Sequence, residues 1–169
     1  IMNFDFQKAR DLMVENQLRP NKIKNPKILD LFKNTKKEDF LSEEIKIIAY
    51  SDLNINLHAN RGYLKNIHIA QLIHNADIKK HHKVLHIGGM TGYISVMLSY
   101  LCQEIIVIEN HEEFSSLFKK NIKNLGIKNL KIINSPFMKG FAEEAPYDVI
   151  FIDNPIDEIS NTIKEQLSL

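Results

Sequence analysis

The stretch that decides the fold is VLHIGGMTGY, residues 84–93, where an apolar run meets three glycines. Residues 84–87 predict a buried β-strand, and the apolar residues 94–98 that follow the glycines predict a helix. A glycine turn between a strand and a helix places free backbone N–H groups and the positive helix end beside the anionic part of a ligand. The stretch therefore predicts a ligand-binding turn at Gly88, Gly89 and Gly92.

Two glycine fingerprints can be compared with this turn. The dinucleotide pattern G-x-G-x-x-G finds only Gly88 in register, so a nicotinamide or flavin site is not expected. The acidic-x-G-x-G-x-G pattern of S-adenosylmethionine (SAM) methyltransferases is matched by Gly88 and Gly92, whereas His86 and Met90 depart from it. The turn by itself also suits a plain connection between a strand and a helix.

Composition limits the class of protein. The chain has 169 residues, 44% hydrophobic and 25% charged, which suits a globular domain with a proper core. Its net charge is +1 and its lysines are scattered, so nucleic acid is not expected as a partner. No apolar run is long enough to cross a bilayer. The single cysteine, Cys102, suits a reducing compartment, and we expect a cytoplasmic protein without a membrane partner.

From residue 79 onward, apolar strands alternate with helical patterns. This alternation predicts an α/β fold, a Rossmann-like, doubly wound and mostly parallel sheet with helices on both faces. We expect this core to occupy residues 79–169. The expected strands are 84–87, 105–108, 130–133 and 149–152. Three helices are expected: one that begins at residue 92, one over 112–125 and one over about 158–167.

Residues 1–78 predict an N-terminal helical and lid region packed on that core. Apolar positions at helical spacing favour a helix over 4–18 that Pro20 ends, a short helix over 26–32 and another over 63–76. The run around 47–50 is expected to be extended, and its surroundings could serve as the lid.

Ligands of parallel sheets bind at the carboxyl ends of the strands. That rule brings together Gly88–Gly92, Glu109, Ser135 and Asp153. Glu109 lies about 20 residues after the turn, where an acidic side chain accepts hydrogen bonds from ribose hydroxyls. The alternative for Glu109 is a charged residue that opens a loop.

The histidines do not predict a metal site. His81, His82 and His86 are close in sequence, but strand geometry sends them to different faces. Since no second cluster completes a ligand set, no metal is expected.

Landmarks along nearly the whole chain resemble the protein-L-isoaspartate O-methyltransferase family, a branch of the class I SAM-dependent methyltransferases. The resemblance implies SAM as cofactor, bound by Gly88, Gly89, Gly92, Glu109 and Ser135. It also implies methyl transfer to an isoaspartyl carboxylate of a protein or peptide, as in protein repair. The landmarks are Arg10–Leu18, Asp39–Leu41, Ala49–Asp52, Asn124–Gly126, Ala145–Ile150 and Gln166–Leu167.

The sequence departs from the family's pattern at four site positions. His86 replaces an acidic residue, Met90 a glycine, Ser135 an aspartate, and Leu64 the serine that binds the methyl acceptor. Arg61 is then a candidate partner for the acceptor carboxylate, or else a surface arginine ahead of a helix. These departures leave a second hypothesis open, a methyltransferase-fold scaffold that binds SAM weakly or not at all.

The fourth strand raises two further expectations. Asp153, a weaker catalytic candidate, opens a D-N-P-I segment in which only Asn154 and Pro155 match the pattern of amino methyltransferases, so N-methylation is the least favoured alternative. Family members continue with further strands that finish the sheet, and these are missing here. We therefore expect the 149–152 strand to be an open edge that another chain or a further segment covers.

Overall fold

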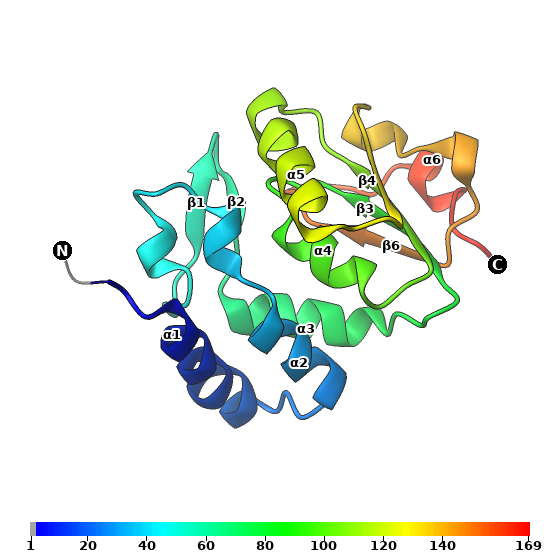
Figure 1. Ribbon diagram of the computed structural model, residues 1–169. Coiled ribbons are helices and arrows are strands. Elements are labelled where there is room, and N and C mark those ends of the chain that lie inside the picture. Colours follow the sequence, from blue (N-terminus) through cyan, green and yellow to red (C-terminus); the bar gives the residue numbers. More distant parts are fainter. Residues whose placement is uncertain (1–2) are drawn as a thin grey trace. The chain divides into compact units, whose positions relative to one another are not determined.

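The computed structural model describes residues 3–169, which fold as two compact units that divide after Asp77. The first unit combines three α-helices with a short antiparallel hairpin (Figure 1). Its helices are α1 (Phe6–Met13), α2 (Pro26–Asn34) and α3 (Asn66–Ala76), and its strands are β1 (Ile55–His58) and β2 (Arg61–Tyr63).

The second unit is built on a parallel sheet of four strands in the order β5-β4-β3-β6. This confirms the predicted α/β class, because each strand is followed by helical segments before the next begins. The strands are β3 (Lys83–Ile87), β4 (Glu104–Ile108), β5 (Leu130–Ile133) and β6 (Val149–Ile152), and the helices are α4 (Tyr93–Ser99), α5 (Glu112–Leu125) and α6 (Asn161–Lys164).

The sheet buries both of its faces. On one face, Leu85 and Ile106 belong to a core cluster that also contains Ile163 of α6 and Tyr147, which precedes β6. On the other face, His86 contacts Ser95 of α4. Strands buried on both sides read as nearly continuous apolar runs, which is why the sequence showed them clearly.

A buried polar network joins separate segments of the first unit. The Arg10 guanidinium donates from Nε to the Tyr50 hydroxyl (2.8 Å) and from Nη2 to Glu38 Oε1 (2.7 Å). The Tyr50 hydroxyl donates to Glu38 Oε2 and accepts from the Lys37 backbone N–H (2.9 Å). Arg10 is 2% exposed and Glu38 9%. The network therefore ties α1 to two segments that are distant in sequence.

Three expectations for the first unit are wrong. The run 47–50 is not extended: it overlaps a 3₁₀ turn, Lys46–Ile48, in which the Ile48 N–H donates to the Ile45 carbonyl and the Ala49 N–H to the Lys46 carbonyl. Tyr63 ends a strand of the hairpin, so α3 begins at Asn66 and not at 63. The first helical run passes through a π-helical turn and a 3₁₀ turn to Asn21, because Pro20 is accommodated at the start of that last turn.

In the second unit, α6 spans only Asn161–Lys164, shorter than the predicted helix over about 158–167. Ser160 caps its first turn by accepting from the Ile163 N–H (3.3 Å). The cap explains the later start of the helix, since a serine at this position satisfies an N–H that has no partner within the helix.

We expect the free energy of unfolding to rise with pH above neutrality because of Lys37. This side chain is fully buried, and burial lowers its pKa from 10.5 to about 7. Between these values the unfolded chain binds more protons than the folded one, so stability increases by at most about 1.4 kcal/mol per pH unit. Urea denaturation between pH 7.5 and 9.5 measures this slope. Lys37→Met should flatten it, whereas Lys36→Met, the same change at the exposed neighbouring lysine, should not. Equal slopes in both variants would contradict the assignment.

Candidate functional site

Four of the predicted site segments lie at one edge of the parallel sheet. Gly88 follows β3, Glu109 follows β4, Ser135 lies just beyond β5, and Asp153 follows β6. Backbone hydrogen bonds extend the sheet into this edge, from Asp153 N–H to the Ile87 carbonyl (2.9 Å) and from Glu109 N–H to the Ile133 carbonyl (3.1 Å). The carboxyl ends of neighbouring strands therefore meet as the sequence predicted.

The glycine turn is tightly packed. Gly88 has φ +92° and Gly92 has φ +104°, backbone conformations that residues with a side chain rarely adopt. A Cβ atom on Gly89 would lie 2.4 Å from Val107 Cγ1 and 2.7 Å from Phe118 Cε2. The glycines are needed because β4 and α5 press against the turn.

The backbone N–H groups of the turn already have acceptors within the chain. Those of Gly88 and Gly89 both donate to the Ile108 carbonyl, at 2.9 and 3.2 Å, and that of Gly92 donates to the Gly89 carbonyl at 3.0 Å. The Met90 N–H donates to Glu109 Oε1 at 2.6 Å. The expectation of free N–H groups is therefore wrong at these four positions. These hydrogen bonds fix the backbone conformation of the turn.

Glu109 is fully buried and fixes the turn from the end of β4. Besides accepting from Met90, its carboxylate accepts from the His111 N–H through Oε2 (2.9 Å). Both carboxylate oxygens of Glu109 thus hold backbone N–H groups on either side of the site edge. Sequence reasoning missed the bond to Met90, which depends on where the backbone of the turn runs.

Met90 occupies the middle of the turn with φ +51°, and it is 1% exposed. A residue with a side chain is rarely found in this left-handed region, which costs about 1–2 kcal/mol for an L-amino acid. The bond to Glu109 and the burial of the side chain offset that cost. Met90 therefore holds a backbone conformation that glycine would adopt without this cost.

His86 lies in the packed interior and not on a ligand-facing surface. It is fully buried, its Nδ1 is 2.7 Å from Ser95 Oγ, and its ring meets that of Phe151 edge to face with centroids 5.3 Å apart. Sequence reasoning missed Ser95, although a serine inside the apolar run 93–98 was a visible signal. The pair joins β3 to α4 beneath the glycine turn.

Ser135 lines a cavity of about 570 Å³ beyond the end of β5. Its hydroxyl donates to the Gly140 carbonyl at 3.3 Å. The volume falls in the range of ordinary ligand pockets. The lining is mixed, with Asn134, Lys139, Glu143 and Thr162 beside apolar side chains.

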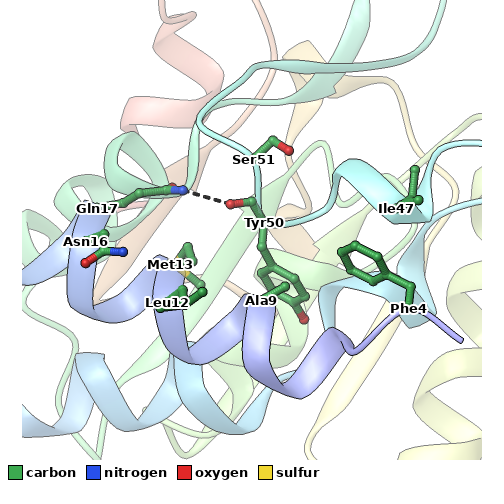
Figure 2. A pocket seen from close by; sticks show the side chains of 9 residues that line it. All are labelled: Phe4, Ala9, Leu12, Met13, Asn16, Gln17, Ile47, Tyr50 and Ser51. Atoms are coloured by element: carbon green, nitrogen blue, oxygen red, sulfur yellow. Dashed lines mark hydrogen bonds between the residues drawn. The ribbon is translucent and has the colours of Figure 1, made fainter. Parts of the chain in front are cut away.

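Arg61, the candidate acceptor-binding residue, lies in β2 of the first unit. The same unit has a groove of about 240 Å³ (Figure 2). One wall of the groove is formed by α1, and Gln17 Nε2 donates to the Tyr50 carbonyl at 2.7 Å beside it (Figure 2). No charged side chain lines this groove, so it offers no cation to pair with a carboxylate. Its lining residues are Phe4, Ala9, Leu12, Met13, Asn16, Gln17, Ile47, Tyr50 and Ser51.

The parallel sheet, the glycine turn after β3 and the acidic residue after β4 define a Rossmann-like methyltransferase fold. A sequence model of the family "Protein-L-isoaspartate(D-aspartate) O-methyltransferase (PCMT)" matches residues 8–169. The chain belongs to this family, which confirms the resemblance found in the sequence.

Curated relatives match along nearly the whole chain. The protein-L-isoaspartate O-methyltransferase of Koribacter versatilis is 26% identical over 168 residues, 99% of this chain and 75% of the relative. That of Protochlamydia amoebophila is 28% identical over 157 residues, 93% of this chain and 75% of the relative.

Two solved structures share the fold. One, a protein-L-isoaspartate O-methyltransferase, has a TM-score of 0.78 and 23% identity, and the match covers 97% of this chain but only 52% of that one. The other, a putative protein-L-isoaspartate O-methyltransferase from Plasmodium falciparum in complex with S-adenosyl-L-homocysteine, has a TM-score of 0.78 and 17% identity, covering 98% of this chain and 81% of that one. In the described residues, 3–169, no helix is both long and apolar enough to cross a membrane.

Proposed function

We propose that this chain is a SAM-dependent methyltransferase that esterifies the free carboxylate of isoaspartyl residues in proteins or peptides. The observation that carries the proposal is the family match over residues 8–169. The relative from Plasmodium falciparum, solved with S-adenosyl-L-homocysteine, supports SAM as the methyl donor.

The residues at the sheet edge fit an adenosine-bearing ligand. Glu109 follows β4 beside the end of β5, the place where an acidic side chain accepts hydrogen bonds from ribose hydroxyls, and Ser135 lines a cavity of ligand size just beyond β5. A Cβ atom on Gly88 would lie 2.8 Å from the Asp153 carbonyl oxygen, and one on Gly92 would lie 2.6 Å from the Phe118 ring of α5, so glycine allows the backbone to pass close to both. We propose these residues, with Gly89, as the cofactor-binding set. When bound, SAM supplies a methyl group on a positively charged sulfur.

Methyl transfer to a carboxylate requires no general acid or base from the protein. A carboxylate oxygen forms the new bond to the methyl carbon as the carbon–sulfur bond breaks, and both charges are neutralised without a proton transfer. The work of the chain is to orient the carboxylate, since positioning supplies much of the rate. We propose Arg61 for this role because a guanidinium pairs with carboxylates through two parallel hydrogen bonds. Asp153, at the edge of the site, is a second catalytic candidate, to which we assign no role in binding the acceptor carboxylate.

Calorimetric titration with SAM and with S-adenosylhomocysteine tests the first half of the proposal, and micromolar binding is the expected result. Transfer of labelled methyl to an isoaspartyl peptide, compared with the same peptide carrying normal aspartate, tests the second half. The alternative is a scaffold that keeps the fold without SAM binding. Met90 favours that alternative, since its buried side chain occupies the middle of the turn. Failure of both ligands to bind would establish it.

Met90→Gly should tighten SAM binding. Glycine removes the side chain and adopts a positive φ without the cost of about 1–2 kcal/mol. The dissociation constant for SAM, measured by calorimetry beside the wild type, is expected to fall. An unchanged or weaker affinity would show that the turn has adapted to methionine.

Two further properties are proposals. Within the described residues, β6 pairs only with β3, and we propose that its other edge is covered by a further chain segment or a partner chain. We also propose a reducing, cytoplasmic location, supported by the single buried cysteine, Cys102.

A further inference from the structure

Lys37 is the most unusual ionisable residue of the first unit. It begins the 3₁₀ turn Lys37–Phe40, and its side chain is completely buried. Lysine is almost never fully buried unless its ammonium group is paired, because taking that charge out of water is costly. An apolar residue would fill the same space at a lower cost. The position of the ammonium group therefore needs an explanation.

The ammonium group of Lys37 contacts the segment that follows β2. Its Nζ donates to Asn66 Oδ1 at 2.7 Å and lies 5.7 Å from the centre of the Tyr63 ring, within the range of a cation–π contact. Asn66 is itself fully buried, and its Nδ2 donates to the Ala49 carbonyl at 3.1 Å. One charge thus fixes the last residue of β2 and the first residue of α3.

The same segment also contacts β1 and Asn54, the residue before β1. Tyr63 pairs with Ile55 in the hairpin, and the Lys65 N–H donates to Asn54 Oδ1 at 2.9 Å. Residues 63–66 are therefore held at both ends, and Arg61 lies in the same three-residue strand as Tyr63. Residues two apart in a strand share a face, so a shift of Tyr63 moves Arg61 with it.

We propose that Lys37 is a positioning residue for the methyl acceptor: by fixing Tyr63 and Asn66, it keeps Arg61 in the conformation that binds the acceptor carboxylate. This inference rests on the proposed function. Lys37 does not touch the substrate and acts only through the segment that follows Arg61. The contact is strongest while the lysine carries its charge, because a charge-assisted hydrogen bond is about twice as strong as a neutral one and a cation–π contact needs the cation.

Lys37 changes its charge near neutral pH, since burial lowers its pKa to about 7. The ionisable groups next to it do not interfere. Arg10 and Glu38 pair with each other, and burial raises the pKa of Tyr50 well above its usual range. A comparison between variants that differ at Lys37 isolates its contribution to the pH profile.

The test is the pH dependence of KM for an isoaspartyl peptide at saturating SAM, between pH 6 and 8.5. In the wild type, KM should rise by roughly tenfold as Lys37 loses its charge, with a smaller change in kcat. Lys37→Met should have a high KM at pH 6 and lack this rise. The matched control Lys36→Met should follow the wild type. The affinity for SAM should be the same in all three proteins.

Asn66→Asp provides an independent readout. A carboxylate opposite the ammonium group favours the charged lysine, so the rise of KM should move to higher pH. This shift does not depend on stability, and it decides the question if Lys37→Met does not fold. Wild-type transfer with a KM profile that neither variant alters would overturn the inference alone. A wild type that transfers no methyl group would overturn the proposed function and this inference together.

Discussion

Replacing Glu109 with alanine is expected to weaken SAM binding and to destabilise the second unit. The change leaves the Met90 and His111 N–H groups without their acceptor. Each unsatisfied donor costs about 1–3 kcal/mol, so the free energy of unfolding should fall by roughly 2–6 kcal/mol. Loss of charge-assisted bonds to ribose should weaken SAM binding by a further ~1.5–3 kcal/mol. Urea denaturation and calorimetry measure the two effects.

Two variants control this experiment. Glu109→Gln keeps one oxygen acceptor and should lose less stability than Glu109→Ala. Glu113→Ala makes the same truncation at an exposed position of α5, where substitutions usually change stability by less than about 0.5 kcal/mol. An unchanged dissociation constant for SAM in Glu109→Ala would refute the ribose-binding assignment, even if stability falls as expected.

Arg10→Met should destabilise the first unit by about 3–5 kcal/mol, because it leaves the buried Glu38 carboxylate without its partner. The side chains of this pair are 3% and 9% exposed. Arg19 and Glu15 form a pair of similar length, 2.9 Å, but their side chains are 47% and 50% exposed. Arg19→Met should therefore cost no more than about 1 kcal/mol.

The double variant Arg10→Met/Glu38→Leu separates the ion pair from simple packing. If the cost of the single change comes from an uncompensated buried charge, removal of both partners should restore part of the lost stability. Purely additive losses, measured by urea denaturation, would show instead that each side chain contributes through its own packing.

The sheet could be predicted because its strands are buried on both faces. Val84–Ile87 and Ile105–Ile108 are continuous runs of mostly apolar residues, and the sequence shows such runs without knowledge of the packing. The carboxyl-end rule then brought Gly88 and Glu109 together. What it could not reveal is that Glu109 accepts from the Met90 N–H, since this bond depends on the path of the backbone through the turn.

The hairpin of the first unit could not be predicted for a local reason. Its two turn residues, Ala59 and Asn60, both have positive φ values, +51° and +62°. In a sequence, such turns are usually recognised by an Asn-Gly or Asp-Gly pair, and the Ala-Asn pair present here does not predict one. The Arg10–Glu38 pair was invisible for a different reason, because its members are 28 residues apart and no periodicity connects them.

The strand order of the sheet also sets the order in which the second unit can assemble. β3 pairs with β4 about 20 residues downstream, but its other neighbour, β6, aligns Val149 with Val84 across a much longer loop. Closing long loops costs entropy before any contact compensates it, so parallel sheets of this kind fold slowly. During synthesis on the ribosome, β3, β4 and β5 emerge before β6. One edge of β3 therefore stays unpaired until the residues of β6 have left the exit tunnel. Unpaired strand edges are prone to mispairing, so a chaperone that shields this edge of β3 should raise the yield of folded protein.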